Sequence, residues 1–180
     1  MCKTLNDLHK KTPDYFLKNI DTFPVDVAKI LRDNHIIVFP VSFVELEKQL
    51  HFKEDSILGI SYARGKELGI MYSENSSETQ KRFTLAHELG HCCLHMNAGS
   101  LYHIEMHIKS DVLENQRKPI ETIDSKKEEE ADSFARDLLI PNSVLLWSLE
   151  NNYQQSIAQL ASKFDVPEDQ MLKKLREIEV

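Results

Sequence analysis

The chain has 180 residues, of which 41% are hydrophobic and 28% are charged, and its formal net charge is −7. This composition is typical of a globular protein with a hydrophobic core, and it excludes a disordered or fibrous chain. The negative charge argues against nucleic acid as the main partner, because affinity for nucleic acid comes largely from neutralising phosphates.

Two further features of the composition concern membranes and thiols. The longest apolar run, residues 36–44, is interrupted by Pro40 and Ser42 and is far shorter than the roughly 20 residues of a membrane-spanning helix. Residues 1–11 are not followed by the apolar stretch of a signal peptide. The three cysteines lack the spacing of a disulfide framework. We therefore expect a cytoplasmic protein with reduced thiols and no membrane partner.

The N-terminal part predicts a small β-sheet with helices. Residues 1–23 form a polar arm or a first helix, and a short amphipathic helix is expected from Pro24 to Asn34. A buried strand is expected at 36–41, with Pro40 near its end or at a sheet edge, and a short helix at 43–50. The runs 57–62 and 68–72 indicate a hairpin, which either binds an extended peptide along an edge strand or only builds core.

A longer helix is expected after this sheet. Ser77 and Gln80 have the spacing of a capping box, which predicts that the helix begins there. Leu85, Leu89 and Cys92 form its apolar stripe, and residues 97–99 are of the kind that end a helix.

This helix carries His87, Glu88 and His91 in an H-E-x-x-H motif. The four-residue step places both imidazoles on one face, about 6 Å apart at Cβ, where one zinc ion can bind a nitrogen of each. Glu88 can then face a metal-bound water and act as general base. Cys92 and Cys93 are turned by about 100° and 200° from His91 around the helix, and we expect them to be buried hydrophobic residues instead of ligands.

The next segment, residues 97–125, shows no sustained period, and we expect an irregular loop that is a lid or is mobile. His103 and His107 are four residues apart within it. Because the segment has no helix signal, we do not expect them to form a second metal site.

Helical pattern returns from Ser125 and ends at Pro141. Small residues beside Glu128 and Asp132 allow another helix to approach closely. Glu128 has two interpretations: a third zinc ligand that leaves a fourth position open for water, with Asp132 orienting a ligand histidine, or a first-turn acid in a capping box begun by Ser125. The residues alone leave both open.

The C-terminal part predicts a short helix at 144–149, then a helix-turn-helix pattern over 157–167 and 171–176. Such a pattern resembles a DNA-reading unit. However, residues 155–180 contain four Lys or Arg against five Asp or Glu. We therefore expect these helices to pack against the catalytic part, with no direct binding to nucleic acid.

Two motifs together carry a family resemblance: H-E-L-G-H followed by Leu94 and His95, and the downstream run Glu128-x-x-Ala131-Asp132-x-Phe134-Ala135-x-x-Leu138-Leu139-Ile140-Pro141. With these motifs the chain, from about Pro24 to the C-terminal helices, resembles the ImmA/IrrE family of intracellular zinc metallopeptidases. The resemblance implies a gluzincin-like site on a single α+β domain. In that site His87, His91 and Glu128 are zinc ligands, Asp132 lies behind them, and Glu129 or Glu130 is the fallback third ligand.

The expected domain spans residues 1–180, with an arm (1–23), the sheet and H-E-x-x-H helix (24–96), the loop (97–125) and a helical part that carries the third ligand (126–180). His95 lies about 12 Å along the helix axis from His87, too far to share its ion, so a structural or substrate-side role is expected. Tyr102, His103, His95 and Tyr153 are candidates for a second donor to the oxyanion.

The resemblance further implies a protein of bacteria, their phages or mobile elements that acts on helix-turn-helix repressors. We therefore expect a zinc endopeptidase that cleaves a transcriptional repressor, an anti-repressor. Two alternatives stay open: a module that sequesters a repressor without cutting it, and a DNA-binding regulator that uses the C-terminal helices. The intact motif favours the enzyme over the first, and the acidic balance disfavours the second.

Overall fold

The computed structural model describes residues 8–18, 20, 22–65, 67–96, 102–109, 124–151 and 155–178. These residues form an α+β protein, as expected, with a four-stranded sheet and a helical C-terminal part. The elements in chain order are α2 (Pro13–Leu17), α3 (Val27–Asp33), β1 (Ile37–Val41), α4 (Val44–Gln49), β2 (Ile57–Arg64), β3 (Glu67–Ser73), α5 (Glu78–Leu94), β4 (Tyr102–Ile108), α7 (Ser125–Leu139), α8 (Asn142–Asn151), α9 (Ile157–Phe164) and α10 (Glu168–Ile178).

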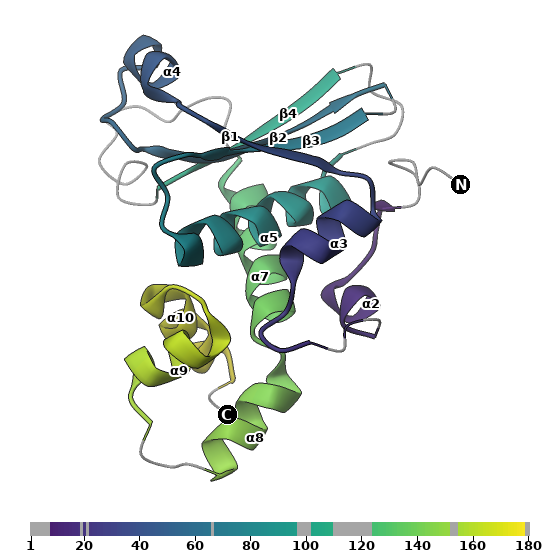
Figure 1. The fold of residues 1–180 in the computed structure, drawn as a ribbon, viewed down its shortest axis with the longest axis vertical. Helices are drawn as coiled ribbons and strands as arrows, with labels where there is room; N and C mark the ends of the chain where they lie inside the picture. Colours follow the sequence, from purple (N-terminus) through teal and green to yellow (C-terminus); the bar gives the residue numbers. More distant parts are fainter. Residues whose placement is uncertain are drawn as a thin grey trace.

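The sheet has the strand order β1-β3-β2-β4, with β1 parallel to β3 and the other pairs antiparallel (Figure 1). β2 and β3 form the predicted hairpin, and their pairing extends to Arg64 and Glu67. Pro40 lies in β1 at one edge of the sheet, as expected, where its missing amide interrupts no ladder between two neighbours.

The prediction of an irregular loop is wrong for residues 102–108, which form β4 and pair with β2. Polar and apolar residues alternate along β4, but here the polar side chains face the interior and an apolar side chain faces outward. Glu105 and His107 are buried, whereas Ile104 is 45% exposed. The polar side chains point inward because they face the polar centre described below; the remainder of 97–125 lies outside the described residues apart from Lys109, Asp124 and the start of α7.

The two faces of the sheet are covered differently (Figure 1). On one face, Phe43, Ile57 and Ile60 form a small cluster with side chains that include Leu46 of α4. On the other face lies α5, part of the main core. Gly59 of β2 makes this approach close, since a Cβ there would lie 2.6 Å from the Thr84 side chain and 2.8 Å from Glu88 Oε1.

α7 crosses behind α5 in the view of Figure 1 and runs from just below the sheet away from it. The crossing is tight at Gly90, where a Cβ would lie 3.2 Å from the Ala131 Cα. The predicted role of the small residues is thereby confirmed. The N-terminal α2 also packs on α7, and Phe16 stacks edge-on against Phe134 with ring centroids 6.3 Å apart.

The C-terminal helices pack on the rest of the protein, as expected. The Arg82 guanidinium of α5 donates to the carbonyls of Phe164, Asp165 and Val25 at 2.6–2.8 Å, and so joins α5 to the end of α9. Phe164 is fully buried.

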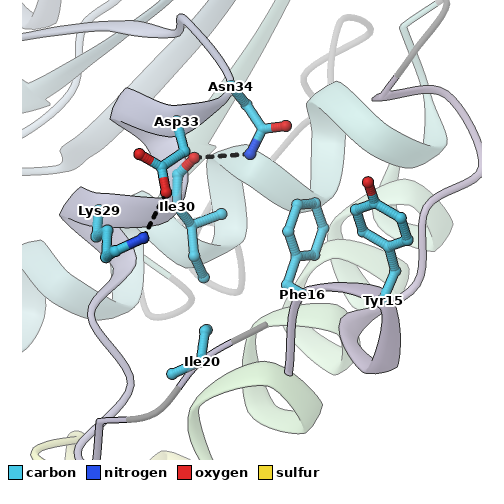
Figure 2. Close-up of a pocket in the computed structure, with 7 residues that line it drawn as sticks. All are labelled: Tyr15, Phe16, Ile20, Lys29, Ile30, Asp33 and Asn34. Atoms are coloured by element: carbon cyan, nitrogen blue, oxygen red, sulfur yellow. Dashed lines mark hydrogen bonds and ion pairs between the residues drawn. The ribbon is translucent and has the colours of Figure 1, made fainter. Parts of the chain in front are cut away.

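A cavity of about 210 Å³ lies between α2 and α3, lined by Tyr15, Phe16 and Ile30 among others (Figure 2). It contains none of the residues expected in the metal site. Among the described residues, no helix has the length and apolar character needed to cross a membrane.

Candidate metal centre

α5 begins where the sequence predicts, so its motif lies in the middle of the helix. The Ser77 side chain accepts a hydrogen bond from the Gln80 amide at 3.2 Å. The Gln80 side chain bonds to Thr84 instead of returning to Ser77, so half of the capping box forms. His87, Glu88 and His91 have relative exposures of 1%, 0% and 0%.

Three potential donor atoms converge on one point. Nε2 of His87 and Nε2 of His91 are 2.9 Å apart, and they lie 3.4 Å and 3.2 Å from the two carboxylate oxygens of Glu128. Donor atoms at about 2.0–2.1 Å from a tetrahedral zinc ion are about 3.3 Å apart. These three residues could therefore hold a metal ion.

The N-terminus of α7 excludes the capping box of one interpretation of Glu128. The N-cap is Asp124, whose carboxylate accepts the Lys126 amide at 3.0 Å, and Ser125 is already helical. The capping-box interpretation is therefore wrong, and the Glu128 carboxylate faces the two histidines. Of the fallback acids, Glu129 pairs with Arg136 at 2.9 Å and Glu130 with His95 at 3.0 Å.

Asp132 lies behind His87, as expected for a residue that orients a ligand. Its carboxylate is 2.9 Å from Nδ1 of His87, so the Nδ1 proton is donated to it and Nε2 faces Glu128. Burial lowers the pKa of His87, but the hydrogen bonds to Asp132 and Glu128 outweigh it and raise the pKa to about 10. Burial would raise the pKa of Asp132, yet the bond to His87 holds it at about 2.

Glu88 is buried beside these residues with an unusual lack of partners. Within the described part of the chain, neither of its carboxylate oxygens has a hydrogen-bond partner. Burial raises the pKa of Glu88 to about 8, although nearby His87 acts to lower it. A carboxyl group with such a pKa can both accept and donate a proton near neutral pH.

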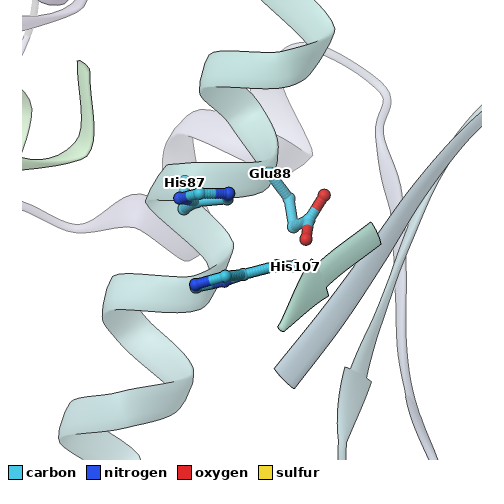
Figure 3. Close-up of side chains that lie close together, drawn as sticks. All are labelled: His87, Glu88 and His107. Carbon is cyan, nitrogen blue, oxygen red and sulfur yellow. The ribbon is translucent and has the colours of Figure 1, made fainter. Parts of the chain in front are cut away.

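β4 supplies a further wall, which sequence reasoning missed. The His107 ring stacks on the His87 ring, with centroids 3.7 Å apart and planes inclined by 11°, and Glu88 lies on the side of the strands (Figure 3). Burial lowers the pKa of His107 well below its usual value. The signal that could have located this wall is the alternation of polar and apolar residues over 103–108.

Glu105, two residues earlier on β4, is held by two cationic or polar neighbours. The Lys127 ammonium of α7 and Nε2 of His103 both lie 2.8 Å from its Oε1. His103 therefore has its partner, Glu105, within β4. One nitrogen of His107 lies close enough to His87 and Glu88 that these three residues form a second group that could hold a metal ion. A cavity of about 240 Å³, lined by His107 and Asp132 among others, opens beside this wall.

The two adjacent cysteines and the two candidate tyrosines remain to be placed. Cys92 and Cys93 are fully buried, and burial raises the pKa of Cys93 to about 12 and that of Cys92 well above its usual value. They are inert buried residues, as expected. Tyr153 and the side chain of Tyr102 lie outside the described part of the chain.

The fold and the donor set are those of a metallopeptidase-like domain: an H-E-x-x-H helix under a sheet, with a carboxylate from a second helix beside both histidines. Comparison with family models confirms the resemblance. The chain belongs to the ImmA/IrrE family, because the family model Peptidase_M78, described as the IrrE N-terminal-like domain, matches residues 47–176. Comparisons with curated proteins and with solved structures give no significant match.

Proposed function

We propose that the chain is a zinc-dependent endopeptidase that cleaves a cytoplasmic regulatory protein, a helix-turn-helix repressor. The observation that carries this proposal is the convergence of His87, His91 and Glu128 to within 3.4 Å of one another, beside a buried Glu88. Membership of a peptidase family supports the reaction class.

In this proposal His87, His91 and Glu128 would hold the zinc ion. When bound, zinc would supply a water molecule of lowered pKa and polarisation of the scissile carbonyl. Two nitrogen donors and one carboxylate are a donor set of catalytic zinc sites. Neither Cys92 nor Cys93 contributes, because their thiols are buried and stay protonated.

Glu88 moves the proton. Its carboxylate takes a proton from the attacking water and passes it to the leaving amine. The pKa of about 8 in the metal-free protein shows how strongly burial favours the protonated form. A nearby cation would lower this pKa, and Glu88 would then begin the reaction as the base.

The proposed substrate segment is extended and lies along β4. In the described sheet β4 pairs only with β2, so its outer edge can bind a strand by main-chain hydrogen bonds, next to His107 and the metal centre. A linker that is already unstructured avoids the cost of unfolding. A net charge of −7 favours encounter with a basic repressor, and cleavage should slow as salt screens this attraction.

The test is incubation of the zinc-loaded protein with a co-encoded repressor, followed by mass spectrometry of the products. We expect cleavage at one site in a loop or linker. Glu88→Gln is the matched control: it should keep zinc and fold but lose turnover by about two orders of magnitude or more. A repressor that stays intact yet leaves its operator DNA would replace the peptidase with a sequestering module.

A further inference from the structure

His95, the C-cap of α5, and Glu130 of α7 form a hydrogen-bonded chain that ends on His91. His95 lies one turn beyond His91, and the Nδ1 atoms of the two rings are 2.9 Å apart. Nε2 of His95 lies 3.0 Å from Oε2 of Glu130. Only 6% of the His95 side chain and none of the His91 side chain is exposed, so water has little access to the bond between the two rings.

The direction of each hydrogen bond follows from the acid at its outer end. The Glu130 carboxylate only accepts, so Nε2 of His95 donates its proton to it. Nδ1 of a neutral His95 then carries a lone pair and accepts. Nδ1 of His91, its partner at 2.9 Å, must therefore be the protonated nitrogen of that ring.

This arrangement determines what His91 presents to the metal centre. With its proton on Nδ1, the ring has a lone pair on Nε2, the atom that lies 2.9 Å from Nε2 of His87 and 3.2 Å from Glu128. In the other tautomer Nε2 would donate a proton to Glu128 and could not bind a metal. Without a partner at Nδ1, the nearby carboxylate would favour that blocked form.

The two histidines of the motif are thus supported by different groups. For His87, Asp132 accepts the Nδ1 proton directly at 2.9 Å. For His91, a second histidine stands between the ring and the acid. Glu130 is 45% exposed, whereas His95 is almost covered, so His95 extends the reach of a surface acid to a buried ring.

We propose that His95 and Glu130 are positioning residues that hold His91 in the tautomer whose Nε2 lone pair faces His87 and Glu128. This inference rests on the proposed zinc site. It assigns a structural task to His95, the C-cap of α5, and to Glu130, the acid next but one to Glu128. Neither residue belongs to the donor set of His87, His91 and Glu128.

The first arm of the test is zinc affinity, measured by competition with a chelator. His95→Leu fills the same buried space without an acceptor and should weaken zinc binding by about 10- to 100-fold. His95→Asn places an amide oxygen as many bonds from Cα as Nδ1, so it should restore most of the affinity. Glu130→Gln should lose about tenfold, because an amide no longer fixes the direction of the chain.

Lys126→Gln is the matched control, because Lys126 lies 3.7 Å from the same Glu130 carboxylate but outside the chain of histidines. Its zinc affinity should equal that of the parent. Circular dichroism of each variant identifies any that fail to fold. Should His95→Leu fold and bind zinc as tightly as the parent, the proposal is overturned.

The second arm is nitrogen NMR of the His91 ring in the metal-free protein. We expect protonated Nδ1 in the parent and a shift towards protonated Nε2 in His95→Leu. Protonated Nε2 in the parent would overturn the proposal whatever the affinities. This arm needs no metal, so it tests the hydrogen-bonded chain of His91, His95 and Glu130 separately from the zinc site. Failure of the zinc site would instead appear as a parent protein that does not bind zinc.

Discussion

At the scale of single residues, a proton on Nε2 of His87 occupies the place where a metal ion would bind. His87 has a raised pKa of about 10, and its Nε2 proton lies between His91 and Glu128. His91 is neutral, because burial lowers its pKa. A metal ion must therefore displace the His87 proton before it can use that nitrogen.

We predict that zinc binding near pH 7 releases at least one proton and that affinity rises at least about tenfold for each pH unit until the pH reaches the His87 pKa of about 10. Glu88, with its pKa of about 8, adds to the release when the cation arrives. Calorimetric titration in buffers of different ionisation enthalpy measures this number. A binding enthalpy that is the same in every buffer would refute the assignment.

The metal-free protein should show the opposite pH dependence. The pKa values of His87 and Glu88 are raised from 6.5 and 4.5 to about 10 and about 8. The stability that these two groups contribute is therefore fully present below their pKa values in the unfolded chain. It is lost as pH rises through their pKa values in the folded protein. Asp132 has a pKa lowered from 3.8 to about 2, so its own contribution is lost only in acid. We expect the free energy of unfolding, measured with urea, to fall between pH 4.5 and about pH 10, the range that the pKa shifts of Glu88 and His87 span.

At the scale of elements, the centre depends on the distance between α5 and α7. Gly90 packs directly on backbone atoms of Ala131, which cannot rotate away, and Glu128 lies one turn earlier on the same helix. The position of the carboxylate relative to His87 and His91 is thus set by a contact between two small residues.

We predict that Gly90→Ala moves α7 outward and weakens zinc binding by about tenfold, as expected when a ligand is misplaced. The stability of the metal-free protein should fall by at most about 2 kcal/mol, because overpacking costs about 1–3 kcal/mol while a helical alanine regains about 1 kcal/mol over glycine. Chelator competition and urea unfolding of the same samples separate the two effects. Unchanged affinity would show that the crossing does not position Glu128.

The sequence predicts elements whose signals are local. The cap, the apolar stripe and the motif of α5 all lie within or next to its 17 residues, so its position and its site residues are readable. β4 depends on pairing with β2 and on a polar environment that only the folded chain creates. The alternation over 103–108 is visible in the sequence, but it does not show that the polar side chains face inward. Asp124 and Ser125 both favour an N-cap, and pattern alone does not choose between them.

At the scale of the whole molecule, the C-terminal helices use their basic side chains internally. Lys174 is 3% exposed and paired with Asp137, and Lys173 lies 3.7 Å from Asp132. Lys163 contacts Ser148 and the Trp147 ring. Three of the four basic residues of 155–180 are thereby engaged. These contacts accord with C-terminal helices that pack against the rest of the protein. The count of charges in the sequence suggests the same role but does not show the contacts.

Charge pairs between residues far apart in the sequence also explain why the sequence alone does not show which of the three adjacent acids faces the histidines. Arg136, 2% exposed, joins Glu129 of α7 to Glu177 of α10, which removes Glu129 from the metal centre. Glu130 is removed by His95. Of the three adjacent acids, Glu128 is therefore the one whose carboxylate faces His87 and His91, while Glu129 and Glu130 have other partners.

We propose that His87, His91 and Glu128 bind zinc, and X-ray absorption at the zinc edge of the loaded protein tests this assignment. We predict nitrogen and oxygen neighbours at about 2.0–2.1 Å with the outer scattering of two imidazoles, and loss of one oxygen neighbour together with weaker binding in Glu128→Ala. A sulfur neighbour at about 2.3 Å, or a spectrum and affinity that Glu128→Ala leaves unchanged, would contradict it.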